Sequence, residues 1–197
     1  MEKIILENLY LNKKLSASQI ATKLQCSNNK INYWLKKFDI KKRSISDATY
    51  LSYNGLKDPF KFNKLLTNDK WFLMGLGIGL YWGEGNKANK SSVKLGNTDP
   101  DLILCFVYFL KKIYNIKENK LKFGLQIFSD IDPKVALKFW QTKLDVKEDQ
   151  FQKPVVSKVR GKGTYKTKST YGVLTVYFNN VKLRNLIIQE IEKLRNI

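Results

Sequence analysis

One acidic side chain closes a string in which glycine returns at every fourth position. The string WFLMGLGIGLYWGEGNK places Gly75, Gly79 and Gly83 on one face of a predicted helix that ends with Glu84 and a helix-stopping Gly85. Each interior glycine costs a helix about 1 kcal/mol relative to alanine, so the repeat indicates close packing of this face against another helix. An acid at the negative end of the helix dipole is also unfavourable. In a basic chain, this placement favours a functional role for Glu84 over that of a solvated surface acid.

Basic residues are the second group that could do chemistry. The 197-residue chain has 36 Lys and Arg against 17 Asp and Glu, a formal net charge of +19, and the excess is largest towards its two ends. Residues 151–170 hold six basic residues and no acid, which predicts a loop or β ribbon that faces phosphates. A general lysine-rich bias is the alternative explanation. On the first interpretation, the ribbon would contact DNA through Lys153, Arg160 and Lys162.

Residue types that are rare or missing narrow the chemistry. The chain has no histidine, which excludes Ser-His-Asp and Cys-His hydrolases, histidine zinc sites and HNH-type nucleases. Cys26 and Cys105 are too few for a cysteine-rich zinc site or a disulfide scaffold, and they fit a reducing compartment. The apolar stretch 71–83 is too short to cross a bilayer. We therefore expect a cytoplasmic protein, nucleoid-associated if prokaryotic, with nucleic acid and not a membrane as its anionic partner.

Residues 1–45 predict a small helix-turn-helix domain. Apolar positions at helical spacing indicate three short helices, with a turn at Gln25–Ser27 between the second and the third. Gln25 departs from the usual pattern, because glycine adopts a left-handed turn conformation more easily. An ordinary three-helix bundle with a polar face is the alternative. On the DNA-binding interpretation, the outward face of the third helix and the basic tail after it would contact base edges and phosphates through Asn28, Asn29, Lys30, Asn32, Tyr33, Lys36, Lys37, Lys41, Lys42 and Arg43.

After a predicted linker over 46–69, residues 70–197 predict an α+β domain with helices on one face of a sheet. Strands are expected over Ser91–Thr98, Lys120–Ser129, Lys153–Val159 and Tyr171–Asn179, because apolar residues alternate there. Helices are expected between them, and a last helix over Val181–Arg195. The uncovered face of the sheet could lie along a duplex groove and would hold Lys94, Lys122, Gln126, Lys158, Thr175 and Tyr177.

The nine residues 77–85, GIGLYWGEG, resemble the LAGLIDADG motif of homing endonucleases. Gly79 and Leu80 match the central Gly-Leu of that motif, Glu84 its last acidic position and Gly85 its closing glycine. Gly77 and Trp82 replace the first leucine and the first aspartate, and the last acid is glutamate where aspartate is commoner. The resemblance covers residues 71–196 and implies a LAGLIDADG-like mixed α/β fold with a DNA-facing β-sheet saddle.

In that family, two such helices pack across a two-fold axis, and each acid binds divalent metal together with a neighbouring backbone carbonyl. The resemblance therefore implies a homodimer through the Gly75, Gly79 and Gly83 face, with Mg²⁺ or Mn²⁺ held by Glu84 and Gly83 of each subunit. One carboxylate alone is a poor magnesium site, whereas two carboxylates with two phosphates form a workable oxygen cage. A nuclease of this kind also needs a cation near the scissile phosphate. The candidates are Lys158, Lys166 and Lys168, with Lys94 as a weaker one.

These expectations lead to one main function and several alternatives. The main one is a sequence-specific double-stranded DNA endonuclease that acts as a metal-dependent homodimer. A DNA-binding transcription regulator that keeps the fold without cleaving is the first alternative, and the helix-turn-helix favours it. An RNA-splicing maturase of the same family would prefer structured intron RNA. A ribosome-associated basic protein would leave the glycine repeat and Glu84 unexplained.

Overall fold

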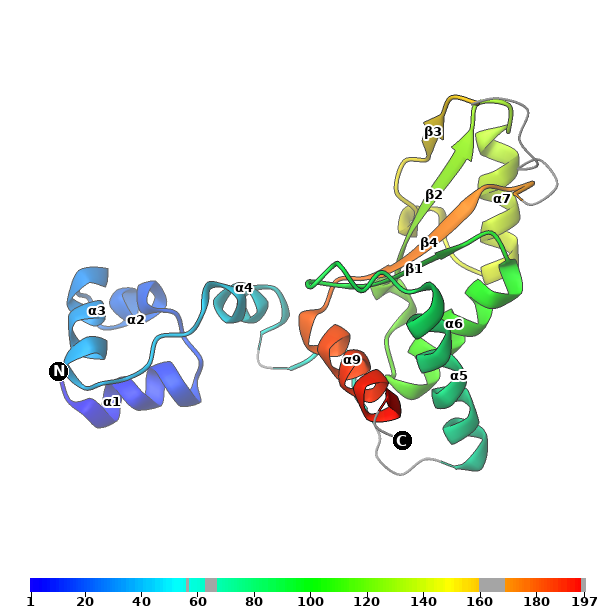
Figure 1. Cartoon of the computed structure of the whole chain (residues 1–197). Helices are drawn as coiled ribbons and strands as arrows, with labels where there is room; N and C mark the ends of the chain where they lie inside the picture. The colour runs from blue at the N-terminus through cyan, green and yellow to red at the C-terminus, as the bar shows by residue number, and fades with distance from the viewer. Residues whose placement is uncertain (56, 63–66, 160–168, 196–197) are drawn as a thin grey trace. The chain divides into compact units, whose positions relative to one another are not determined.

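The computed structural model describes residues 1–55, 57–62, 67–159 and 169–195. The chain divides into two units, Met1–Asp58 and Pro59–Ile197 (Figure 1). Within the described residues, no helix combines the length and the apolar character that crossing a membrane requires.

Unit 1 is helical, and its apolar core joins residues from several short helices. Leu6, Ile20, Ile31 and Leu35 are fully buried in it. Each of the last three helices starts at a serine, Ser16, Ser27 or Ser44, whose hydroxyl accepts a hydrogen bond from the backbone N–H three residues on, as N-cap residues do. The elements are α1 (Lys3–Glu7), the π-helix η1 (Asn8–Asn12), α2 (Ala17–Lys23), α3 (Asn28–Lys37) and α4 (Ile45–Asn54).

Helix α4 occupies the first part of the stretch for which the sequence predicts a linker. The Ser44 cap starts this helix, and the Tyr50 hydroxyl donates to the Asp58 carboxylate at 2.7 Å, which ties the segment after α4 back to it. The boundary between the units follows Asp58. The structure thus places residues 46–58 in unit 1 and 59–69 in unit 2.

Unit 2 is an α+β fold, which confirms the class expected for residues 70–197. In the described part of the unit, four strands form one mixed sheet in the order β1-β4-β2-β3, where β4 is antiparallel to β1 and β2, and β3 is parallel to β2. The elements in chain order are α5 (Asn68–Glu84), β1 (Val93–Asn97), α6 (Pro100–Ile113), η2 (Glu118–Lys120), β2 (Lys122–Phe128), α7 (Pro133–Leu144), η3 (Glu148–Gln150), β3 (Val155–Ser157), β4 (Val173–Phe178) and α9 (Val181–Arg195).

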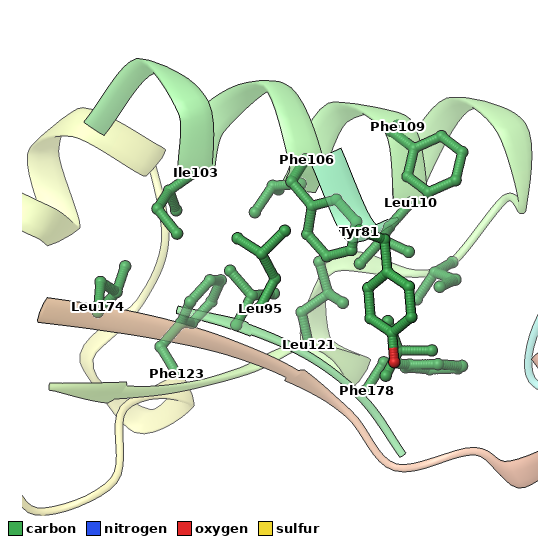
Figure 2. Packing of buried hydrophobic residues seen from close by; sticks show 14 of the residues in the cluster. Tyr81, Leu95, Ile103, Phe106, Phe109, Leu110, Leu121, Phe123, Leu174 and Phe178 are labelled. Atoms are coloured by element: carbon green, nitrogen blue, oxygen red, sulfur yellow. The ribbon is translucent and has the colours of Figure 1, made fainter. Parts of the chain in front are cut away.

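The core of unit 2 lies between helix α6 and one face of the sheet. Side chains alternate along each strand, so Leu95, Phe123 and Leu174 all point to the helical side and are buried. Figure 2 shows α6 lying across the sheet with Ile103 and Phe106 directed towards these strand residues. The polar residues that alternate with these apolar residues along the strands therefore lie on the other face of the sheet.

Candidate functional site

Helix α5 has an inward face that packs within unit 2. Met74, Ile78 and Tyr81 are buried there, and the Tyr81 ring stacks on Phe106 with the centroids 6.1 Å apart. Gly77 belongs to this inward face, because a Cβ added at this position would overlap the Phe109 ring. Glycine at position 77 thus allows α5 to approach α6 closely.

The opposite face of α5 carries Gly75, Gly79 and Gly83 and is exposed. A Cβ added at any of these three glycines would meet no atom within 4 Å. They line an open hollow of about 680 Å³ together with apolar side chains, among which Trp71 is 54% and Phe72 75% exposed. We call these three glycines the glycine stripe. Among the described residues, no helix of the same chain packs on the stripe, so the close contact that the sequence predicts has no partner within the chain.

Glu84 lies in the last turn of α5, at the end of the hollow lined by the glycine stripe. Its side chain is exposed and has no hydrogen bond or ion pair with any described residue. The next residue, Gly85, is buried in extended backbone with φ −70°, so it does not end the helix by a left-handed conformation. A Cβ at position 85 would overlap Tyr81, and this contact explains the glycine.

Lys87 is a residue of this site that the sequence reasoning missed. Its ammonium donates to the carbonyl oxygens of Trp82 at 2.8 Å and of Gly83 at 3.3 Å, and so caps the last turn of α5. Its own carbonyl accepts from Arg184 Nη2 of α9 at 2.8 Å. The sequence does contain a feature that could have indicated this role: Lys87 lies within one turn of the predicted helix end, three residues after Glu84.

The donor set that one chain offers to a divalent cation is the Glu84 carboxylate and the Gly83 carbonyl. Both are hard oxygen ligands of the type that Mg²⁺ prefers. The described residues contain no group of three or more side chains of the metal-ligating types. The Gly83 carbonyl is also shared with the Lys87 ammonium. One carboxylate and one shared carbonyl oxygen are fewer ligands than Mg²⁺ takes, so these two groups of a single chain do not by themselves make a magnesium site.

The outer face of the sheet brings together several of the predicted DNA contacts. Lys94 and Lys122 lie on either side of Tyr177 in the strand register, and the Lys94 ammonium is 5.1 Å from the centre of the Tyr177 ring. Thr175 lies two residues before Tyr177 on β4, and Gln126 is exposed on β2. Lys153 and Lys158 are exposed on either side of strand β3. The predicted residues Arg160, Lys162, Lys166 and Lys168 lie outside the described residues.

Helix α3 of unit 1 presents most of its predicted contacts to solvent. Asn32 is half-buried, and its amide nitrogen donates to the Asn28 carbonyl at 3.1 Å. The Lys37 ammonium lies 4.9 Å from the centre of the Trp34 ring. Gln25 has φ +49°, so the turn takes the left-handed conformation without a glycine. The predicted contacts whose side chains are exposed are Asn28, Asn29, Lys30, Tyr33, Lys36, Lys37, Lys41 and Lys42.

Arg43 is placed differently from the expectation that it contacts phosphates. Its guanidinium donates to the carbonyls of Lys14, at 2.7 Å, and of Leu15, and it lies 4.1 Å from the centre of the Tyr10 ring. Its backbone N–H donates to the Tyr10 hydroxyl at 3.0 Å. These contacts make Arg43 a link between the segment after α3 and the end of η1, because carbonyl oxygens and a ring already occupy its guanidinium.

Comparison of the chain with known protein families, with curated proteins and with solved structures found no match. The case for a function therefore comes from the residues of α5, the sheet and α3 themselves.

Proposed function

We propose that the protein is a homodimeric, sequence-specific endonuclease of double-stranded DNA that uses Mg²⁺ or Mn²⁺ bound by Glu84 of each subunit. The observation that carries the proposal is the glycine stripe of α5, which no described residue covers and which ends at Glu84, an acid without a partner among the described residues. The resemblance of residues 77–85 to the LAGLIDADG motif supports the same interpretation.

The cost of the glycine stripe supports the proposed dimer. Gly75 and Gly79, which lie inside the helix, together cost about 2 kcal/mol of helix stability relative to alanine, and no packing within the described chain offsets this cost. A second copy of the chain presents the same stripe, so the surface complements itself across a two-fold axis. If the two-fold axis is roughly parallel to the two α5 helices, the helices run in the same direction and both Glu84 residues lie at the same end of the pair. The ligands of the two chains would then form one oxygen site.

Different residues would bind the cation, the DNA backbone and the DNA bases. Glu84 and the Gly83 carbonyl would hold the divalent cation, which when bound would supply Lewis-acid activation of water and stabilisation of the leaving oxygen. The half-buried Lys94 and the exposed Lys122 and Lys158 would hold backbone phosphates in register. Helix α3 would act as the recognition helix of a helix-turn-helix, since Asn side chains pair with adenine edges in the major groove.

The test is selection from a random duplex library in the presence of Mg²⁺, with bound and cut molecules scored separately. We expect the wild type to cut a defined sequence. We expect Glu84→Gln to bind that sequence at least as tightly without cutting it, because the substitution removes the carboxylate that would bind the cation and keeps the fold. Glu192→Gln is the matched control, since Glu192 is exposed on α9, and it should cut like the wild type. A wild-type protein that cuts no molecule of the library with Mg²⁺ or Mn²⁺ would refute the proposal.

A second candidate is a dimeric DNA-binding regulator that does not cleave. The observation that favours it is the exposed polar face of α3 in a unit separate from α5, because a cleaving domain with its own DNA-facing sheet does not require a second reading module. In the same selection, a regulator would enrich one bound sequence in both the wild type and Glu84→Gln and would leave every duplex intact.

A further inference from the structure

A second basic feature of unit 2 lies at the end of helix α5 that is remote from Glu84. Lys61, Lys70, Lys111 and Lys112 line a cavity of about 350 Å³ together with Ile113 and Asn115. Lys70 is in the first turn of α5 and Glu84 in its last, so the two are about 21 Å apart along the helix at 1.5 Å per residue. The lysine cavity is therefore separate from the site at Glu84.

The position of Lys61 in the cavity is fixed by its neighbours. Phe60 and Phe62 both pack on the Tyr114 ring, with centroids 6.3 and 5.5 Å from it. The backbone N–H of Lys61 donates to the Tyr114 carbonyl at 2.8 Å. These contacts hold the segment around residue 61 against the end of α6, beside the start of α5. Three chain segments thus bring their lysines to one cavity.

The lysines of the cavity differ in how their charges are compensated. Lys111 forms an ion pair with Glu118 at 2.9 Å, and the Lys112 ammonium lies 5.4 Å from the centre of the Tyr108 ring. Both are in the last turn of α6, where the helix dipole favours cations. The ammonium groups of Lys61 and Lys70 have no hydrogen-bond or ion-pair partner in the described part of the chain. The α6 dipole does not account for these two, because they belong to other segments.

We propose that this cavity binds phosphate groups, as an anion-binding site distinct from the outer face of the sheet. Ammonium groups bind phosphate as point charges, and a multiply charged anion would relieve the repulsion among four lysines around one cavity. The volume falls in the range of small-molecule sites, about 300–1,000 Å³, so it has room for a diphosphate or a stretch of phosphodiester backbone. The proposal does not depend on whether the protein cleaves DNA.

The experiment compares the full-length wild type with Lys61→Gln/Lys70→Gln and with the control Lys134→Gln/Lys138→Gln, which removes two exposed charges from α7. Pyrophosphate affinity is measured by calorimetry. A short DNA duplex is measured over a range of salt concentrations. Loss of charge-assisted hydrogen bonds predicts at least about tenfold weaker pyrophosphate binding in the cavity variant only. If the phosphates belong to a nucleic-acid backbone instead, the cavity variant lowers the salt slope of duplex binding by about 2, and the control lowers it less.

A second measurement needs no variant and so does not depend on whether a variant folds. The wild type is acetylated at its lysines with and without pyrophosphate or duplex, and the modified sites are identified by mass spectrometry. The proposal predicts protection of Lys61 and Lys70, and none of Lys134 and Lys138. If neither ligand protects Lys61 and Lys70, and if the cavity variant binds both ligands as the control does, the proposal is wrong and the lysines serve only as solvated surface charge.

Discussion

Replacement of Gly79 by leucine tests two effects of the glycine stripe separately: the loss of helix stability in the single chain and the proposed contact between two chains. Position 79 is exposed in the middle of α5, and no atom lies within 4 Å of an added Cβ. Leucine therefore fits the single chain and raises its free energy of unfolding by about 0.7 kcal/mol through helix propensity alone. In the proposed dimer, the same side chain keeps the two α5 backbones apart. We expect Gly79→Leu to be a more stable monomer, while the wild type is a dimer.

Light scattering gives the oligomeric state, and urea unfolding over about a hundredfold range of protein concentration gives the coupling of folding to association. The unfolding midpoint of the wild type should rise with concentration, and that of Gly79→Leu should not. Gly77→Ala is the matched control on the inward face. Its Cβ overlaps the Phe109 ring, so it should lose about 1–3 kcal/mol of stability and remain dimeric. A Gly79→Leu protein that is still a dimer would refute the assignment of the stripe as the interface.

Two further predictions concern the surroundings of α5. Lys87→Met removes the ammonium from the Trp82 and Gly83 carbonyls and should lower the free energy of unfolding by about 1 kcal/mol, measured in urea, whereas Lys90→Met in the same loop should have no effect. Burial raises the pKa of Tyr114, and the Glu190 carboxylate adds to this. The unfolded chain therefore loses this proton first, so the contribution to stability is fully present below pH 10 and falls as the pH rises above it. Tyr114→Phe should make the free energy of unfolding, measured in urea, less dependent on pH above pH 10. An unchanged pH dependence would contradict a raised pKa of Tyr114.

The elements of unit 2 could be predicted from the sequence where the determinants are local. The last helix has the predicted bounds, Val181–Arg195, and the predicted strands contain the observed β1 to β4. Asp99 and Asp132 cap α6 and α7, and a proline follows each of them at the first helical position. Alternation and capping act over a few residues, which is why one sequence suffices to find them.

Features that depend on distant parts of the chain could not be predicted. The central position of β4 in the sheet depends on pairing with β1 and β2, which are separated from it by helices. The sequence predicts close packing at Gly75, Gly79 and Gly83, whereas the close contact within the described chain is at Gly77, which is packed on Phe109. Arg43 looks like part of a basic tail, because its partners Tyr10 and Lys14 lie about 30 residues earlier.

The two proposed functions make different demands on Glu84. An acid at the negative end of a helix costs about 0.3–1 kcal/mol, and two carboxylates brought to about 4 Å by the proposed dimer would repel by about 1 kcal/mol even in water. The phosphates of a bound duplex would add to this repulsion. A dimer that only binds DNA would be more stable and would bind more tightly with a neutral side chain at position 84. A divalent cation bound by the two Glu84 side chains would make each of these interactions favourable. Glu84, which has no partner in the described part of the chain, is therefore a reason to prefer the metal-dependent nuclease over the regulator.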